Sequence, residues 1–277
     1  MIALIRTEFT KAAFRTRTLV VALLLVALPT LIVVAINARS DRPRRGDGGE
    51  GLFRLASQSG LLVPAAVLSA TSGLLLIIIA GTFAGDSVAS DASWGNLRYV
   101  LMRPVSRVRL VLAKAFVAGT LIWAATILVA LAALIAGLLL FGAHAVTVPS
   151  VGLQLGSIHL STGALALRAL IATGYVAFGF SALLAIGTLF STLTDTAASA
   201  IGATVGVYIV SEILDSISQL GQVRYAFPTH YLDAWETMFT DNTYSREMAI
   251  GIAVQLSYLV VIGAIAVMWF NRKDIRS

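Results

Sequence analysis

The chain has 277 residues, of which 58% are hydrophobic and only 12% are charged, and its mean hydropathy is +0.88. Soluble domains carry about a quarter charged residues, so this composition excludes soluble enzymes, nucleic-acid-binding modules and secreted disulfide scaffolds. The apolar residues form long runs instead of alternating, which argues against an outer-membrane β-barrel. Basic cytoplasmic loops and contact with anionic lipid explain the net charge of +6 better than a nucleic-acid partner does.

A membrane-spanning helix needs about 20 mostly apolar residues. Six segments meet this requirement, namely Thr18–Ile36, Leu61–Ala84, Leu110–Phe141, Ala164–Phe190, Ala197–Leu214 and Met248–Phe270. The first run is longer than a signal-peptide core and no Ala-x-Ala site follows it, so we expect a retained anchor. The sequence therefore predicts an all-α polytopic membrane protein that forms a single transmembrane domain, residues 1–277.

The positions of Lys and Arg predict the orientation of these spans. With the N-terminus inside, twelve basic residues lie in cytoplasmic segments and seven lie outside, with Arg168 at the end of a span. The bias is incomplete because Ser40–Gly49 places an arginine cluster outside. We expect both termini inside, in the plasma (inner) membrane.

Three segments outside the spans have recognisable patterns. Before the first span, Ile2, Ile5, Phe9 and Ala13 have helical spacing, which predicts an amphipathic helix in the cytoplasmic interface or, alternatively, a charged extension. Residues 229–239 predict a short outer interfacial helix with Thr229 as its N-cap, which either anchors the chain or gates a substrate path. Alternation in His144–Leu160 predicts a small extracellular hairpin.

The longest cytoplasmic loop, residues 85–109, has a helix–break–helix pattern. Trp94, Leu97 and Leu101 make a narrow apolar stripe, with Arg98 and Asp91 on other faces. Arg103-Pro104 ends the first helix because a residue before proline avoids the α region, and Ser106 can cap the next helix. A small apolar knob with charges around it suits a groove on a soluble partner, or a helix lying flat on lipid.

The same loop resembles a known family. The run Asp91-x-x-x-Gly95-Asn96-Leu97-Arg98, followed by Leu101-x-Arg103-Pro104-Val105-Ser106-Arg107, resembles the loop between spans two and three of type-2 ABC exporter permeases. Asp91 and Asn96 depart from the Glu and Thr usual there. The C-terminal run Phe270-Asn-Arg-Lys-Asp-Ile275 and the six spans extend the resemblance over the whole chain.

The resemblance implies a permease subunit that forms the translocation path, pairs with a second permease (homo- or heterodimer) and binds two cytoplasmic ATPases. Residues 86–102 would be the coupling helix that docks on the ATPase. The ATPase-coupling residues would be Asp86, Asp91, Trp94, Leu97, Arg98, Leu101, Arg103 and Pro104. This chain has no G-x-x-x-x-G-K-[ST] loop, so ATP and Mg would bind on the partner and no cofactor is expected here.

Other signals are weaker. Gly81-x-x-x-Gly85 and Gly202-x-x-x-Gly206 let helices approach closely, within one subunit or between two permeases. Arg168 and Glu212 lie near outer span ends and can snorkel. The three histidines lack metal-like spacing, and no catalytic Ser/His/Asp or HExxH pattern is present.

Three other functions compete with the exporter permease. An ion-coupled secondary transporter normally has ionisable residues near the bilayer midplane, whereas most spans here have apolar centres. A membrane-embedded enzyme would need a cluster of catalytic residues within the spans. This sequence has no such cluster there, so we do not expect an enzyme. A non-transporting membrane scaffold for an ATPase is a further alternative. An apolar path would suit lipids, hydrophobic drugs or peptides.

Overall fold

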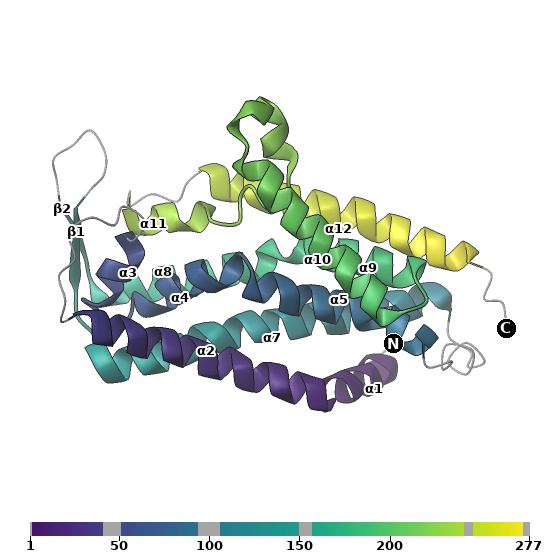
Figure 1. Cartoon of the computed structure of the whole chain (residues 1–277), viewed down its shortest axis with the longest axis horizontal. Helices are drawn as coiled ribbons and strands as arrows, with labels where there is room; N and C mark the ends of the chain where they lie inside the picture. The colour runs from purple at the N-terminus through teal and green to yellow at the C-terminus, as the bar shows by residue number, and fades with distance from the viewer. Residues whose placement is uncertain (1, 41–50, 94–105, 150–156, 241–245, 274–277) are drawn as a thin grey trace.

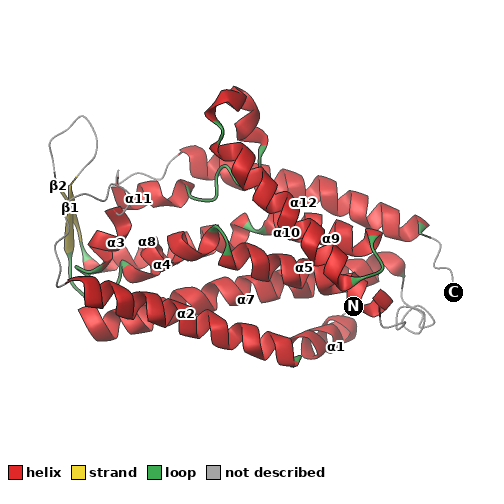
Figure 2. Cartoon of the chain, viewed as in Figure 1, coloured by secondary structure: helices red, strands yellow, loops and turns green. Residues whose placement is uncertain are grey.

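A computed structural model describes residues 2–40, 51–93, 106–149, 157–240 and 246–273. The fold is almost entirely helical (Figures 1 and 2), and six of its helical segments are long and apolar enough to cross a membrane. These segments are Thr16–Ala38, Leu75–Ser93, Arg107–Phe141, Thr162–Leu193, Ala197–Ser216 and Arg246–Arg272. The chain is therefore an all-α protein with the helices of a multi-pass membrane protein.

The helices run along the long axis of the molecule, so the bundle has two distinct ends (Figure 1). Both chain termini lie at one end, which we call the terminal end. At the other, the hairpin end, strands β1 (Val146–Pro149) and β2 (Ser157–Leu160) pair antiparallel, with Val146 opposite Leu160. The predicted hairpin is thus confirmed as a hairpin. An even number of spans returns the chain to its starting side, which agrees with this arrangement.

The two N-terminal helices lie along one side of the bundle. Helix α1 (Ile2–Ala13) occupies the terminal end, and α2 (Thr16–Ser40) runs from there toward the hairpin end (Figure 1). Helix α1 thus lies where the sequence predicts an amphipathic helix, and its place in the cytoplasmic interface stays a prediction. In the spanning part of α2 only 17% of the residues are buried, so most of this helix is free to face lipid or another protein.

Helix α5 (Leu75–Ser93) is the central helix of the bundle. It packs against α7 (Arg107–Phe141), α9 (Ser181–Leu193) and α10 (Ala197–Ser216), and 72% of its spanning residues are buried. Its hydropathy is the lowest among the six segments. A polar helix is stable in a bilayer when protein surrounds it, which explains why the least apolar span lies in the middle.

The predicted second span, Leu61–Ala84, is wrong as a single helix. The structure divides it into α4 (Val63–Ser72) and α5, with a turn at Gly73–Leu74. The hydroxyls of Thr71 and Ser72 donate to carbonyls in the preceding turn, a pattern that bends helices, and glycine is a weak helix former. Helix α5 then continues nine residues beyond the predicted end, so residues 85–93 continue the spanning helix and do not begin a separate coupling helix.

The predicted fourth span also has a break. Helix α8 (Thr162–Gly179) ends at Phe180, and α9 begins at Ser181. The break frees the amide of Ala182, which donates to Oε1 of Gln255 in α12 (Arg246–Arg272) over 2.9 Å. A buried amide needs such a partner, so Gln255 stabilises the break.

The segment between α10 and α12 is folded into the bundle. It contains two 3-10 helices, Ser218–Ala226 and Ala234–Glu236, followed by α11 (Thr237–Thr240). The predicted outer interfacial helix over residues 229–239 is therefore wrong. Trp235, Met238 and Phe239 are at most 1% exposed, and Thr229 bonds to Ser211 over 2.9 Å instead of capping a helix. These three side chains belong to the protein core.

Helix α7 is a single element of 35 residues that runs the length of the bundle. Ser106 is its N-cap, as predicted, and its hydroxyl accepts from the amide of Arg109 over 3.4 Å. Near the hairpin end, a Cβ on Gly137 would stand 2.8 Å from the carbonyl oxygen of Gly60. The short helix α3 (Gly51–Ala56) ends four residues before Gly60 in the chain.

Candidate functional site: a charge cluster at the base of the α5–α7 connection

Buried charges meet where α1, α5 and α7 come together at the terminal end. We call Glu8, Lys11, Arg15, Arg17, Asp86, Asp91 and Lys114 the charge cluster. Asp91 is 2% exposed and Lys114 is 4% exposed, so both charges are almost fully removed from solvent. Charged side chains inside a membrane bundle are rare and pair with one another, which makes this cluster the first candidate for function.

Lys114 connects three helices. Its Nζ lies 2.5 Å from Oδ2 of Asp91 in α5 and donates to Oε2 of Glu8 in α1 over 2.9 Å. The other oxygen of Asp91 accepts from Nζ of Lys11 over 2.7 Å. The buried Asp91 carboxylate thus contacts two lysines, and the buried Lys114 contacts two carboxylates.

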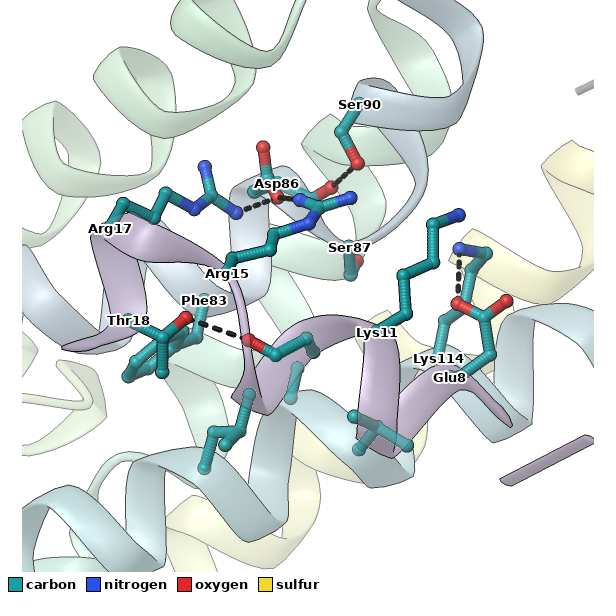
Figure 3. Close-up of a pocket in the computed structure, with 14 residues that line it drawn as sticks. Glu8, Lys11, Arg15, Arg17, Thr18, Phe83, Asp86, Ser87, Ser90 and Lys114 are labelled. Carbon is teal, nitrogen blue, oxygen red and sulfur yellow. Dashed lines mark hydrogen bonds and ion pairs between the residues drawn. The ribbon is translucent and has the colours of Figure 1, made fainter. Parts of the chain in front are cut away.

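Asp86 receives the two arginines of the elbow between α1 and α2. Arg15 donates to Oδ2 of Asp86 over 2.8 Å, and Arg17 binds the same oxygen (Figure 3). The Ser90 hydroxyl donates to the backbone carbonyl of Asp86 over 2.8 Å. The elbow between the N-terminal helices is therefore attached to the middle of α5.

The cluster is electrically near balance. Four cations (Lys11, Arg15, Arg17, Lys114) face three carboxylates (Glu8, Asp86, Asp91), which leaves one excess positive charge. The adjoining cavity is about 40 Å³, which holds a few water molecules at most. The charges are paired with one another across three helices, which is the geometry of a joint between helices.

This joint lies at the base of the predicted coupling segment. Helix α5 ends at Ser93, two residues after Asp91, and α7 begins at Arg107, seven residues before Lys114, so the cluster lies near both helix ends that flank residues 94–105. Across the entry point, the Arg107 guanidinium donates to the carbonyl oxygens of Asn271 and Lys273, over 3.4 and 2.8 Å. Both helix ends that flank the connection are thus attached to other helices.

The predicted coupling residues fall into two groups. Trp94, Leu97, Arg98, Leu101, Arg103 and Pro104 lie outside the described residues. Asp86 and Asp91, which the sequence interpretation placed on a docking surface, are buried and paired within the chain. Their structural position is that of anchors for α5, and the reason is the extension of α5 beyond Ala84.

The glycine pairs differ from one another. A Cβ on Gly85 would stand 2.9 Å from Cα of Ile201 in α10, and one on Gly81 would stand 2.6 Å from a methyl of Val205. These two glycines therefore pack α5 against α10 within the chain. Gly202 and Gly206 have no such neighbour within 4 Å.

Sequence reasoning missed the partners of the two aspartates. Lys114 is one of the twelve basic residues that the charge count assigns to cytoplasmic segments, although it falls inside the predicted third span. A lysine within an apolar run requires a carboxylate partner, and Asp86 and Asp91 were the nearest acids on the same side. Elsewhere, Arg168 donates to the carbonyl of Met238 and so holds α11. Within the described part of the chain, no three His, Asp or Glu side chains form a group that could hold a metal ion.

Comparison with known proteins adds a family to this description. No curated protein matches the chain. A family model described as "Protein of unknown function (DUF2705)" matches residues 51–276. That range includes Asp86, Asp91 and Lys114, and it begins after the α1–α2 elbow. Since the match covers most of the 277 residues, the chain belongs to the DUF2705 family.

Proposed function

We propose that the chain is the permease subunit of an ATP-binding cassette exporter, which works with separate cytoplasmic ATPase subunits and a second permease in the plasma membrane. The observation that carries this proposal is the α5–α7 connection. Its sequence resembles the coupling loop of type-2 exporter permeases. It joins the end of α5, which lies beside the buried Asp91–Lys114 pair, to the start of α7, where Arg107 donates to the Lys273 carbonyl.

The charge cluster supports a mechanical role for this connection. A force that an ATPase applied to residues 94–105 would act on the ends of α5 and α7. Because Lys114 and Asp91 link both helices to α1, the force would be shared with the first span. Packed helices move as discrete bodies, so ATPase closure would tilt spans and open a path on the far side.

The proposal can be tested by changing the centre of the apolar stripe. The affinity-tagged chain is purified from its native membranes, and the copurifying proteins are searched for an ATPase with a phosphate loop. Leu97→Asp places a charge at the proposed contact, so we expect loss of the ATPase or uncoupling of its hydrolysis from transport. Val223→Asp, which adds the same charge at an exposed site on a 3-10 helix, is the matched control. Normal copurification and transport in Leu97→Asp would refute the docking contact.

Two alternatives have distinct outcomes. Ion-coupled transport would use the buried Asp91–Lys114 pair, which lies within two spanning helices but near their terminal ends instead of their middle. Transport in reconstituted vesicles that requires a pH gradient, with no ATPase present, would support it. An ATPase that copurifies without any transport in vesicles would instead indicate a membrane scaffold.

A further inference from the structure

An apolar groove runs between three spanning helices on the outer surface of the bundle. Its volume is about 450 Å³, and its walls come from α7, α9 and α12. The lining includes Leu112 and Ala115 of α7, Leu184 of α9, and Val260, Gly263 and Met268 of α12. The one polar lining residue, Thr188, turns its hydroxyl to the carbonyl of Leu184 over 2.7 Å. This volume falls in the usual range for small-molecule sites, roughly 300–1,000 Å³.

The groove is open on its lipid-facing side. Leu112, Val260 and Met268 are 47, 65 and 55% exposed, and only 17% of the spanning residues of α12 are buried. In a bilayer, acyl chains must cover these side chains. Lipid tails are as apolar as leucine, so the groove by itself supplies shape and no preference for one kind of lipid.

A basic rim at the terminal end of the groove supplies that preference. Arg272 lies one helical turn beyond Met268, and Arg109 lies three residues before Leu112, so both continue the faces that line the groove. Both residues are exposed, and neither forms an ion pair with another described residue. Between them, the Arg107 bonds to the carbonyls of Asn271 and Lys273 hold the two helix ends together.

We propose that this groove binds one anionic phospholipid from the leaflet at the terminal end. One acyl chain lies along α7, α9 and α12, and the phosphate is held by Arg109 and Arg272. Basic pockets between spanning helices recognise acidic headgroups in this way. The groove shares no lining residue with the cavity beside the charge cluster, so the bound lipid is a structural or regulatory ligand and does not depend on the exporter role proposed above.

The test uses native mass spectrometry of the detergent-purified chain titrated with phosphatidylglycerol or phosphatidylcholine. We expect phosphatidylglycerol to bind more tightly, and Gly263→Leu to weaken its binding about tenfold or more because the new side chain displaces methylene groups. A Cβ at Gly263 would meet no atom of another part of the protein within 4 Å, so the variant should fold. Gly174→Leu in α8, where the surroundings are equally open, is the matched control and should bind as the wild type does.

The rim is tested separately. Arg109→Gln and Arg272→Gln should each weaken phosphatidylglycerol binding about fivefold and leave phosphatidylcholine binding unchanged. Arg246→Gln, at the opposite end of α12, should change neither. Equal affinity for the two lipids, or wild-type binding by Gly263→Leu, would overturn the proposal. So would efficient disulfide cross-linking of Met268→Cys between two copies in membranes, because a second protein would then fill the groove.

Discussion

At the scale of single residues, Lys114 forms two of the five ion pairs of the charge cluster. It is the only lysine among the described residues that contacts two carboxylates, and these come from two different helices. Removing one partner of a buried ion pair leaves an unpaired charge, which costs more than the pair itself contributes. The effect of changing Lys114 should therefore exceed that of changing an exposed lysine.

We predict that Lys114→Met lowers the free energy of unfolding by about 3 kcal/mol, the lower end of the range for breaking a buried pair. The lower end applies because Lys11 still neutralises Asp91. Lys273→Met is the control: its partner Asp195 is 80% exposed, so its loss should cost less than about 1 kcal/mol. Equilibrium unfolding in detergent micelles measures both values. Equal effects of the two variants would show that the cluster is not a stabilising joint.

The glycines of α5 allow a second prediction at this scale. Gly85→Ala places a methyl 2.9 Å from the backbone of Ile201, so α5 and α10 must separate, at an overpacking cost of about 1–3 kcal/mol. Gly202→Ala on α10 meets no neighbour within 4 Å and should be neutral or slightly stabilising in the isolated subunit. Thermal unfolding of the two variants side by side tests this difference.

At the scale of elements, the segment from Phe227 to Phe239 depends on polar contacts from three helices. Tyr175 of α8 donates to the carbonyl of Tyr231 over 2.7 Å, and Gln255 of α12 donates to that of Pro228 over 2.7 Å. Ser211 of α10 bonds to Thr229. Irregular backbone is tolerated at membrane depth where protein satisfies its polar groups, so these contacts are a condition for the fold of the segment.

Gln255→Leu should release this segment without unfolding the bundle. The variant leaves the Ala182 amide and the Pro228 carbonyl without partners, at about 1–3 kcal/mol for each buried group left unsatisfied. Hydrogen exchange should rise at residues 227–239 and at the start of α9, and stay unchanged in α2. Ser257→Ala, on the exposed side of the same helix, provides the control. Unchanged exchange at residues 227–239 in Gln255→Leu would contradict this account.

The elements also show what the sequence can predict. Apolar runs overlap all six helical segments that are long enough to cross a membrane, because a bilayer demands long apolar helices, but the second run includes α4 and misses the last nine residues of α5. Breaks such as Gly73 and Phe180 were missed because an apolar run looks the same on both sides of a bend. The burial of Trp235 was missed because an aromatic residue suits both a core and a headgroup layer. The Asp91–Lys114 pair depends on how α5 and α7 are aligned, which no local pattern encodes.

At the scale of the whole molecule, the arrangement of the two ends makes a prediction about membrane sidedness. The α9–α10 turn lies at the terminal end, where Asp195 pairs with Lys273, and the β-hairpin lies at the other end. With the orientation inferred from Lys and Arg, the terminal end faces the cytoplasm.

Labelling of introduced cysteines can test this arrangement, because the chain has no cysteine of its own. Ser199→Cys should react with an impermeant thiol reagent only after cells are permeabilised, whereas His159→Cys should react in intact cells. Both positions are exposed. Reaction of both variants in intact cells would disprove a bundle that crosses the membrane between these two ends.

The length of α7 has a consequence for how movement would pass through the protein. Thirty-five residues at about 1.5 Å each make a rod of about 52 Å, well beyond a hydrocarbon core of about 30 Å. It has no proline to bend it, and its contact with Gly60 lies close to the hairpin end. If α7 pivots as a rigid rod where Gly137 meets Gly60, the end of α7 farthest from that contact moves most. A small rotation about Gly60 would therefore appear as a large sideways displacement of Lys114.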